Sequence, residues 1–191
     1  MKDKSVWVIL LCVVLMLGLA ALAGCGTDAG SGGPETGPGG GTDTADNAEE
    51  EQVYQVAVCF ANKEYIDTGN EALDKFNIYT EEITSAPEDV YLDALELLRE
   101  PSDESDSTMI TEQVVFNDAY LEGDTVYVDF KSVGPNSGSL GEGFLVSQIV
   151  NTLLSFDEVT QVQFLVNGEV TETLMGHVGT AEPFTKDVFT E

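Results

Sequence analysis

The chain of 191 residues contains a single histidine, His177. A Ser-His-Asp triad would have to use this side chain as its base, and a histidine metal cluster would need more than one. His177 lies in a glycine-bearing segment, 175–179, and no Gly-x-Ser-x-Gly nucleophile elbow occurs in the sequence. We therefore interpret His177 as a structural or surface residue, and we expect no catalytic residues and no metal site.

Carboxylates are abundant, with 35 Asp and Glu residues against seven Lys and Arg. At this density neighbouring carboxylates arise by chance, so a glycosidase-like pair stays open as an alternative. The acidic run 103–106 lacks the alternating ligands, the glycine and the distal glutamate of an EF-hand loop, and we interpret it as a solvated loop. The sequence has no Gly-x-x-x-x-Gly-Lys phosphate-binding run, and we expect no cofactor.

The first residues have the layout of a secretory signal, with lysines before an apolar stretch that begins at Val6. The stretch closes at 22–25 on Leu-Ala-Gly-Cys, which resembles a bacterial lipobox. The resemblance implies cleavage before Cys25, palmitate-type acylation of its thiol, and a location on the extracytoplasmic side of the cell membrane. Two or three acyl chains, at about 0.8 kcal/mol per buried methylene, hold a protein on a membrane. An uncleaved transmembrane helix is the alternative interpretation.

Without residues 1–24 the chain keeps five basic and 34 acidic residues, a formal charge of −29. Nucleic acid and anionic lipid headgroups both attract positive surfaces, so this charge argues against either as a partner. Membrane attachment is therefore expected through the lipid anchor.

The three cysteines allow no disulfide within the mature chain, because Cys12 belongs to the signal and Cys25 to the anchor. Only Cys59 remains, in the run 56–60, where alternating apolar residues predict a strand. We interpret Cys59 as a small packed residue rather than a reactive thiol, since this run holds no Lys, Arg or His to lower its pKa.

The composition divides the chain into three parts. Residues 1–24 are the signal peptide, and residues 25–51 are the lipidated cysteine with a Gly-rich, acidic linker that is expected to be disordered. A flexible linker of this length has a root-mean-square span of about 25–30 Å and would tether the domain to the membrane without fixing its orientation. Residues 52–191 form one domain, which is large enough to bury a core.

Apolar periodicity predicts a mixture of strands and helices in this domain. Ser85 and Glu88 have the spacing of a capping box, which predicts a helix from Ser85 to about Glu100, before Pro101. Asn167 and Gly168 predict a tight turn. The other expected elements are strands at about 54–60, 76–83, 114–121, 125–130 and 159–166, a loop at 133–143, and a helix at about 142–156.

The expected helix at 142–156 has an apolar stripe and, on its other side, a strip of uncharged polar residues. A free helix face in so acidic a protein would more often carry Glu or Asp. The strip is therefore either a contact face kept clear of like-charge repulsion or a face that packs against the loop 133–143. Its members are Ser147, Gln148, Asn151, Thr152 and Ser155.

Several short runs, in their order and spacing, resemble the GerMN domain of sporulation and spore-germination proteins. They are 97–101 (Leu-Leu-Arg-Glu-Pro), 127–130 (Tyr-Val-Asp-Phe), 148–153 (Gln-Ile-Val-Asn-Thr-Leu), 167–168 (Asn-Gly), 176–178 (Gly-His-Val) and 183–184 (Pro-Phe). The resemblance implies an α+β fold, in which a small mixed or antiparallel sheet has two helices packed on one face, in a single GerMN-like domain. It also implies an extracytoplasmic protein without catalytic residues that acts through protein or cell-envelope contacts.

The sequence thus predicts a membrane-anchored, non-enzymatic interaction module that serves sporulation, germination or a related envelope process. Its partner is expected to be an envelope protein or a cell-wall component. A lipoprotein that binds a wall glycan or peptide is one alternative, and an envelope hydrolase is another. The only tryptophan, Trp7, leaves with the signal, so glycan stacking would rely on Tyr or Phe side chains.

Overall fold

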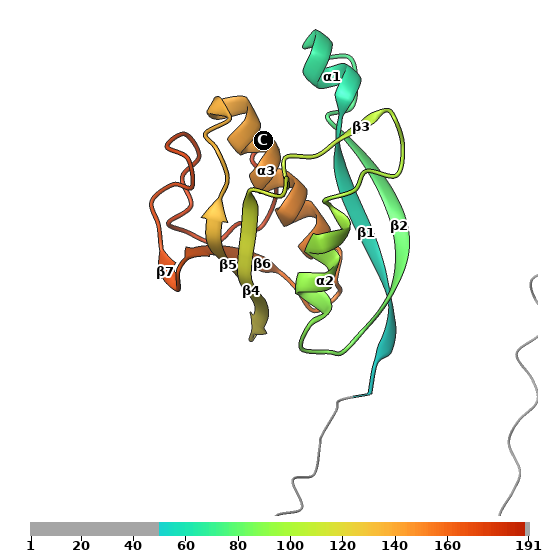
Figure 1. Cartoon of the computed structure of the whole chain (residues 1–191), viewed down its shortest axis with the longest axis vertical. Coiled ribbons are helices and arrows are strands. Elements are labelled where there is room, and N and C mark those ends of the chain that lie inside the picture. The colour runs from blue at the N-terminus through green and yellow to red at the C-terminus, as the bar shows by residue number, and fades with distance from the viewer. Residues whose placement is uncertain (1–49, 190–191) are drawn as a thin grey trace, which may run out of the picture. The chain divides into compact units, whose positions relative to one another are not determined.

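The structure is a computed structural model that describes residues 50–189, so the expected signal peptide, Cys25 and nearly all of the linker lie outside the described residues. Two sheets and three helices make up the described part (Figure 1). The first sheet has the order β2-β1-β3, with β1 Gln52–Asn62, β2 Phe76–Ser85 and β3 Asp106–Ser107. The second has the order β4-β5-β6-β7, with β4 Val114–Glu122, β5 Thr125–Val133, β6 Gln161–Val166 and β7 Glu169–Val170. The helices are α1 Lys63–Thr68, α2 Val90–Leu97 and α3 Gly138–Leu153.

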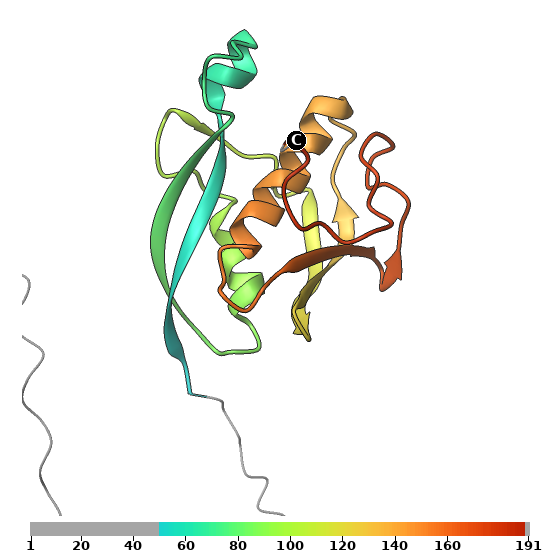
Figure 2. The ribbon, with the colours of Figure 1, turned by 180° about the vertical axis from the view of Figure 1, so that it is seen from behind.

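Helices α2 and α3 lie between the two sheets, as both views show (Figures 1 and 2). Helix α3 packs against β1, and α2 packs against both β4 and α3. Alternate residues of β1 and β5, such as Val58 and Val128, point into the core and are almost completely buried. Helix α1 instead stands at the far end of the β1–β2 hairpin, away from the other helices (Figure 1).

The expected α+β class is confirmed, and the structure adds that the strands divide between two sheets. Strand β1 pairs with β2 along ten residues and with β3 over two. Strand β5 pairs with β4 in an antiparallel hairpin and with β6 in parallel. A helix between two sheets is covered on both sides, and all residues from 141 to 150 in α3 are buried.

The expected tight turn at Asn167 and Gly168 is present, and a second turn joins β4 to β5. Strands β4 and β5 meet in a turn where Gly123 has a positive φ of 68°. Asn167 and Gly168 have φ values of 53° and 81°, and they join β6 to β7. Two consecutive residues with positive φ are typical of the two-residue turns that the Asn-Gly pair favours.

The predicted capping box is wrong. The N-cap of α2 is Asp89, whose side chain makes no capping hydrogen bond. The Ser85 hydroxyl instead donates to the Asp93 carboxylate at 2.7 Å, because β2 extends through Ser85 and holds it outside the helix. The sequence also gave no sign of α1, which begins after Asn62; the Asn62 side chain accepts hydrogen bonds from the Glu64 and Tyr65 amides. Within residues 50–189 no helix is long and apolar enough to cross a membrane.

Candidate functional site

The polar strip of α3 faces the interior of the domain. Ser147, Gln148 and Thr152 have no exposed surface, and Asn151 and Ser155 are half-buried. Helix α3 lies beside β1 (Figure 2). Its polar side chains form hydrogen bonds with β1 rather than facing solvent. A buried polar side chain is costly unless it forms hydrogen bonds.

The strip forms its hydrogen bonds with the edge of β1 that faces α3. The Cys59 amide donates to Thr152 Oγ1 at 3.1 Å, and the Ala57 amide donates to Ser155 Oγ at 3.2 Å. Gln148 Nε2 donates to the Cys59 carbonyl at 3.4 Å. Strand β3 pairs with β1 only at Ala61 and Asn62. At Ala57 and Cys59, the side chains of the strip therefore pair with the backbone groups of β1 in place of a neighbouring strand.

The same strip also holds two other segments of the chain. Gln148 Oε1 accepts from the Met109 amide at 2.9 Å. Ser147 Oγ accepts from the Val188 amide at 3.2 Å, and Asn151 Nδ2 donates to Asp187 Oδ2 at 3.2 Å. The contact-face interpretation is therefore corrected: the strip packs within its own domain, against β1 and these two segments rather than against the loop 133–143.

Cys59 is a packed residue, as its strand position predicts. It is 1% exposed and unpaired with another cysteine. Burial raises the pKa of its thiol to about 12, and the hydrogen bond from Asn151 only partly opposes this effect. A thiol held protonated is a poor nucleophile and a poor metal ligand.

Glu142 in α3 is a buried carboxylate that sequence reasoning missed. Its Oε1 accepts from the amides of Leu174 and Met175 at 3.1 and 2.8 Å, and its Oε2 accepts from the His177 amide at 2.8 Å. Three amide donors compensate for the loss of water around the charge. Glu142 therefore fixes the segment 174–177 against α3, while the His177 side chain is exposed, as expected for a surface residue.

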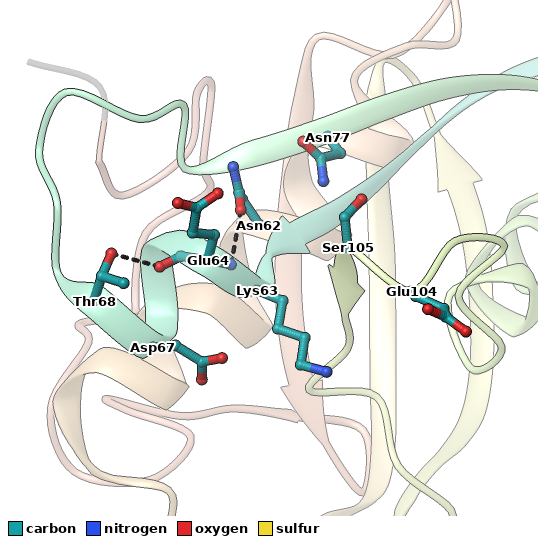
Figure 3. A pocket seen from close by; sticks show the side chains of 8 residues that line it. All are labelled: Asn62, Lys63, Glu64, Asp67, Thr68, Asn77, Glu104 and Ser105. Carbon is teal, nitrogen blue, oxygen red and sulfur yellow. Dashed lines mark hydrogen bonds between the residues drawn. The ribbon is translucent and has the colours of Figure 1, made fainter.

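A cavity of about 380 Å³ lies beside α1 (Figure 3). Its lining residues are all of polar or charged types, and they come from α1, the adjoining ends of β1 and β2, and the segment before β3 (Figure 3). The lining residues are Asn62, Lys63, Glu64, Asp67, Thr68, Asn77, Glu104 and Ser105. It holds no histidine or cysteine, and in the described part of the chain no group of His, Cys, Asp and Glu is placed to hold a metal ion.

Asp106 holds Asn77, one of the residues that line this cavity. Its Oδ1 accepts from Asn77 Nδ2 at 2.8 Å and from the Tyr79 hydroxyl at 3.2 Å. Its Oδ2 is buried and has no hydrogen-bond partner among residues 50–189. The cavity could accept a small polar molecule, but it contains no paired nucleophile and base that would support a reaction.

The outer edge of β2 is the longest regular strand edge that the fold leaves open. Its ten residues pair with β1 without a register shift, and no hydrogen bond within residues 50–189 reaches its other side. The edge formed by β4 is different, because register shifts on both sides of Phe116 interrupt it. Bulges protect an edge against pairing with another chain, and β2 lacks one.

Solved structures similar to this chain include two from GerM and one from a clostridial protein. The first GerMN domain of the sporulation protein GerM from Bacillus subtilis has a TM-score of 0.53 at 16% identity, over 70% of this chain and 96% of that chain. A candidate lipoprotein from Clostridium perfringens has a TM-score of 0.49 at 16% identity, over 72% and 89%. The tandem GerMN domains of GerM have a TM-score of 0.48 at 20% identity, over 76% of this chain and 48% of that longer chain.

The sequence was also compared with curated proteins and with models of protein families. No curated protein matches the chain. Residues 57–172 match the Germane family model, whose description is sporulation and spore germination. The matched range begins within β1 and ends just after β7, so it contains nearly all of both sheets and all three described helices. The GerMN resemblance is thereby confirmed, and the chain belongs to the Germane family of sporulation and spore germination.

Proposed function

We propose that this chain is an extracytoplasmic lipoprotein whose GerMN-type domain is a non-enzymatic, protein-binding module of the cell envelope in sporulation or germination. The open edge of β2 is the observation that carries this proposal. An extended segment of a partner can add to such an edge through main-chain hydrogen bonds, while side chains next to the edge select its sequence.

The side chains beside this edge support a contact of that kind. Ile78 on β2 is 63% exposed and Val53 on β1 is 62% exposed, although both are aliphatic. The register places Ile78 opposite Cys59 and Val53 opposite Thr84, so both side chains lie on the sheet face opposite to Val58. If a strand of the partner paired with β2, apolar side chains of that strand would contact Ile78.

Photo-crosslinking in cells tests the contact. A photoreactive residue at position 78 of the full chain is expected to crosslink to a protein of the envelope. Position 170 is the matched control, because Val170 is also an exposed strand residue, at 55%. Equal crosslinking at both positions, or none at position 78, would contradict a contact at the β2 edge.

Membrane anchoring rests on the lipobox-like run 22–25 and is tested separately. Cys25→Ala is expected to abolish incorporation of a clickable fatty acid, because the only other cysteine of the mature chain, Cys59, is buried. The matched control is Cys59→Ala, which should keep the label. A fatty-acid label that persists on the Cys25→Ala protein would contradict the anchor.

A further inference from the structure

Two tyrosines form a pair on the outer face of the second sheet, away from the helices. Tyr120 on β4 lies directly opposite Tyr127 on β5. The ring centroids are 5.5 Å apart and the ring planes differ by 15°, which is a stacked arrangement. Both rings are half-exposed, whereas Val126 and Val128, the sequence neighbours of Tyr127, are completely buried on the other face.

Carboxylates surround this tyrosine pair. Asp118 lies opposite Asp129 in the β4–β5 register, two residues from each tyrosine along its strand. Glu122 follows Tyr120 by two residues on the other side, so all these side chains share one face. Partial burial raises the pKa of the Tyr120 hydroxyl, and the charge of Glu122, the neighbouring Tyr127 and the charges of Asp118 and Asp129 add to this effect in that order.

These carboxylates have no cationic partner within residues 50–189. The only ion pair there joins Arg99 to Glu96, on α2 and just after it. Asp129 accepts hydrogen bonds from neutral donors, Asn117 Nδ2 at 2.9 Å and the Gly168 amide at 2.8 Å. Like charges directly opposite each other on a sheet are unfavourable, and a bound cation would relieve that repulsion.

We propose that Tyr120, Tyr127, Asp118 and Glu122 form a binding site for a lysine or arginine side chain of a basic peptide segment. An ammonium or guanidinium group over a tyrosine ring is attracted by the negative face of the ring. The flanking carboxylates then neutralise its charge, and the net charge of −28 on the chain increases the rate of encounter with a basic segment. A neutral glycan could stack on the rings, but it would leave the repulsion between the carboxylates in place.

This site goes beyond the proposed function, since it lies on the second sheet and the open β2 edge belongs to the first. Fluorescence anisotropy with fluorescein-labelled pentalysine and the full chain in nonionic detergent measures binding directly. Tyr120→Leu/Tyr127→Leu removes both rings and leaves the net charge unchanged. Binding is expected to weaken by about two- to fivefold for each ring that contacts the cation, the value of an exposed cation–π contact.

A second pair of variants separates this site from general electrostatic attraction. Asp118→Asn/Glu122→Gln and the control Glu88→Gln/Glu100→Gln each remove two exposed carboxylates. The first is expected to weaken pentalysine binding more strongly than the control. Equal losses in these two proteins, or unchanged binding without the tyrosines, would overturn the proposal. Because exposed carboxylates contribute little to folding, this comparison remains decisive if the leucine variant does not fold.

A glycan ligand is distinguished with tetra-N-acetylchitotetraose as the probe. The proposed site predicts that this neutral oligosaccharide does not displace labelled pentalysine. Displacement by the oligosaccharide, or binding of it that is lost in Tyr120→Leu/Tyr127→Leu, would overturn the proposal in favour of glycan recognition.

Discussion

The hydrogen bond between α3 and β1 gives a sharp prediction about stability. Thr152 Oγ1 accepts from the Cys59 amide at 3.1 Å, and both residues are almost completely buried. Thr152→Val replaces the hydroxyl with a methyl group of nearly the same shape. The variant therefore keeps the packing and leaves the Cys59 N–H without an acceptor.

The expected cost follows from that unpaired donor. A buried polar group without a partner costs about 1–3 kcal/mol, whereas exposed substitutions usually stay within about 0.5 kcal/mol. The extra methyl offsets only part of this cost, because its burial contributes about 0.8 kcal/mol. For a domain of this size, we expect the net loss to lower the thermal midpoint by up to roughly 7 °C.

Urea denaturation of the full chain, followed by far-ultraviolet circular dichroism, measures the change. Thr152→Ser is the matched control, since it keeps the acceptor and loses only a methyl group. Thr84→Val makes the same chemical change at an exposed strand position and should be nearly neutral. A Thr152→Val protein as stable as the parent would refute the idea that α3 completes the edge of β1.

Three other perturbations test the buried polar contacts. Glu142→Gln should destabilise the domain by about 1–3 kcal/mol, because one of its acceptor oxygens becomes a donor, and hydrogen exchange should show less protection of the His177 amide. Asn151→Glu should lower the urea midpoint, since it places a carboxylate beside Asp187. An unchanged midpoint would indicate that the side chain at position 151 is exposed to solvent. The contribution of the protonated Cys59 thiol to the free energy of unfolding should be complete below about pH 9 and should decline as the pH rises toward 12, because only the unfolded thiol ionises in that window. In a pH series of unfolding free energies, Cys59→Ala should lack this decline.

Strand positions and tight turns could be predicted from local sequence. The alternation of Val126, Val128 and Phe130 gives a strand with one apolar face whatever surrounds it, and the structure buries all three. Asn167 and Gly168 can adopt positive φ at low cost, so they mark the β6–β7 turn independently of tertiary contacts. The buried position of Cys59 followed from its place in such a strand.

The polar strip of α3 shows where this reasoning stops. Uncharged polar residues on one side of a helix fit an exposed contact face and a buried hydrogen-bonding face equally well. The choice depends on whether an unpaired strand edge lies opposite, and that edge exists only because β3 covers just two residues of β1. Glu142 was missed for the same reason: its amide donors lie more than 30 residues away in the sequence.

The sequence by itself determined the class of the domain, most of its strands and its family, because apolar periodicity, turn residues and motif order are local properties. The tertiary structure alone decided that the strands form two sheets and that α3 is buried between them. It also decided that Tyr120 and Tyr127 stack among carboxylates on the outer face of the second sheet. Each of these depends on strand register and on which segments meet across long sequence separations, and no local pattern encodes that pairing.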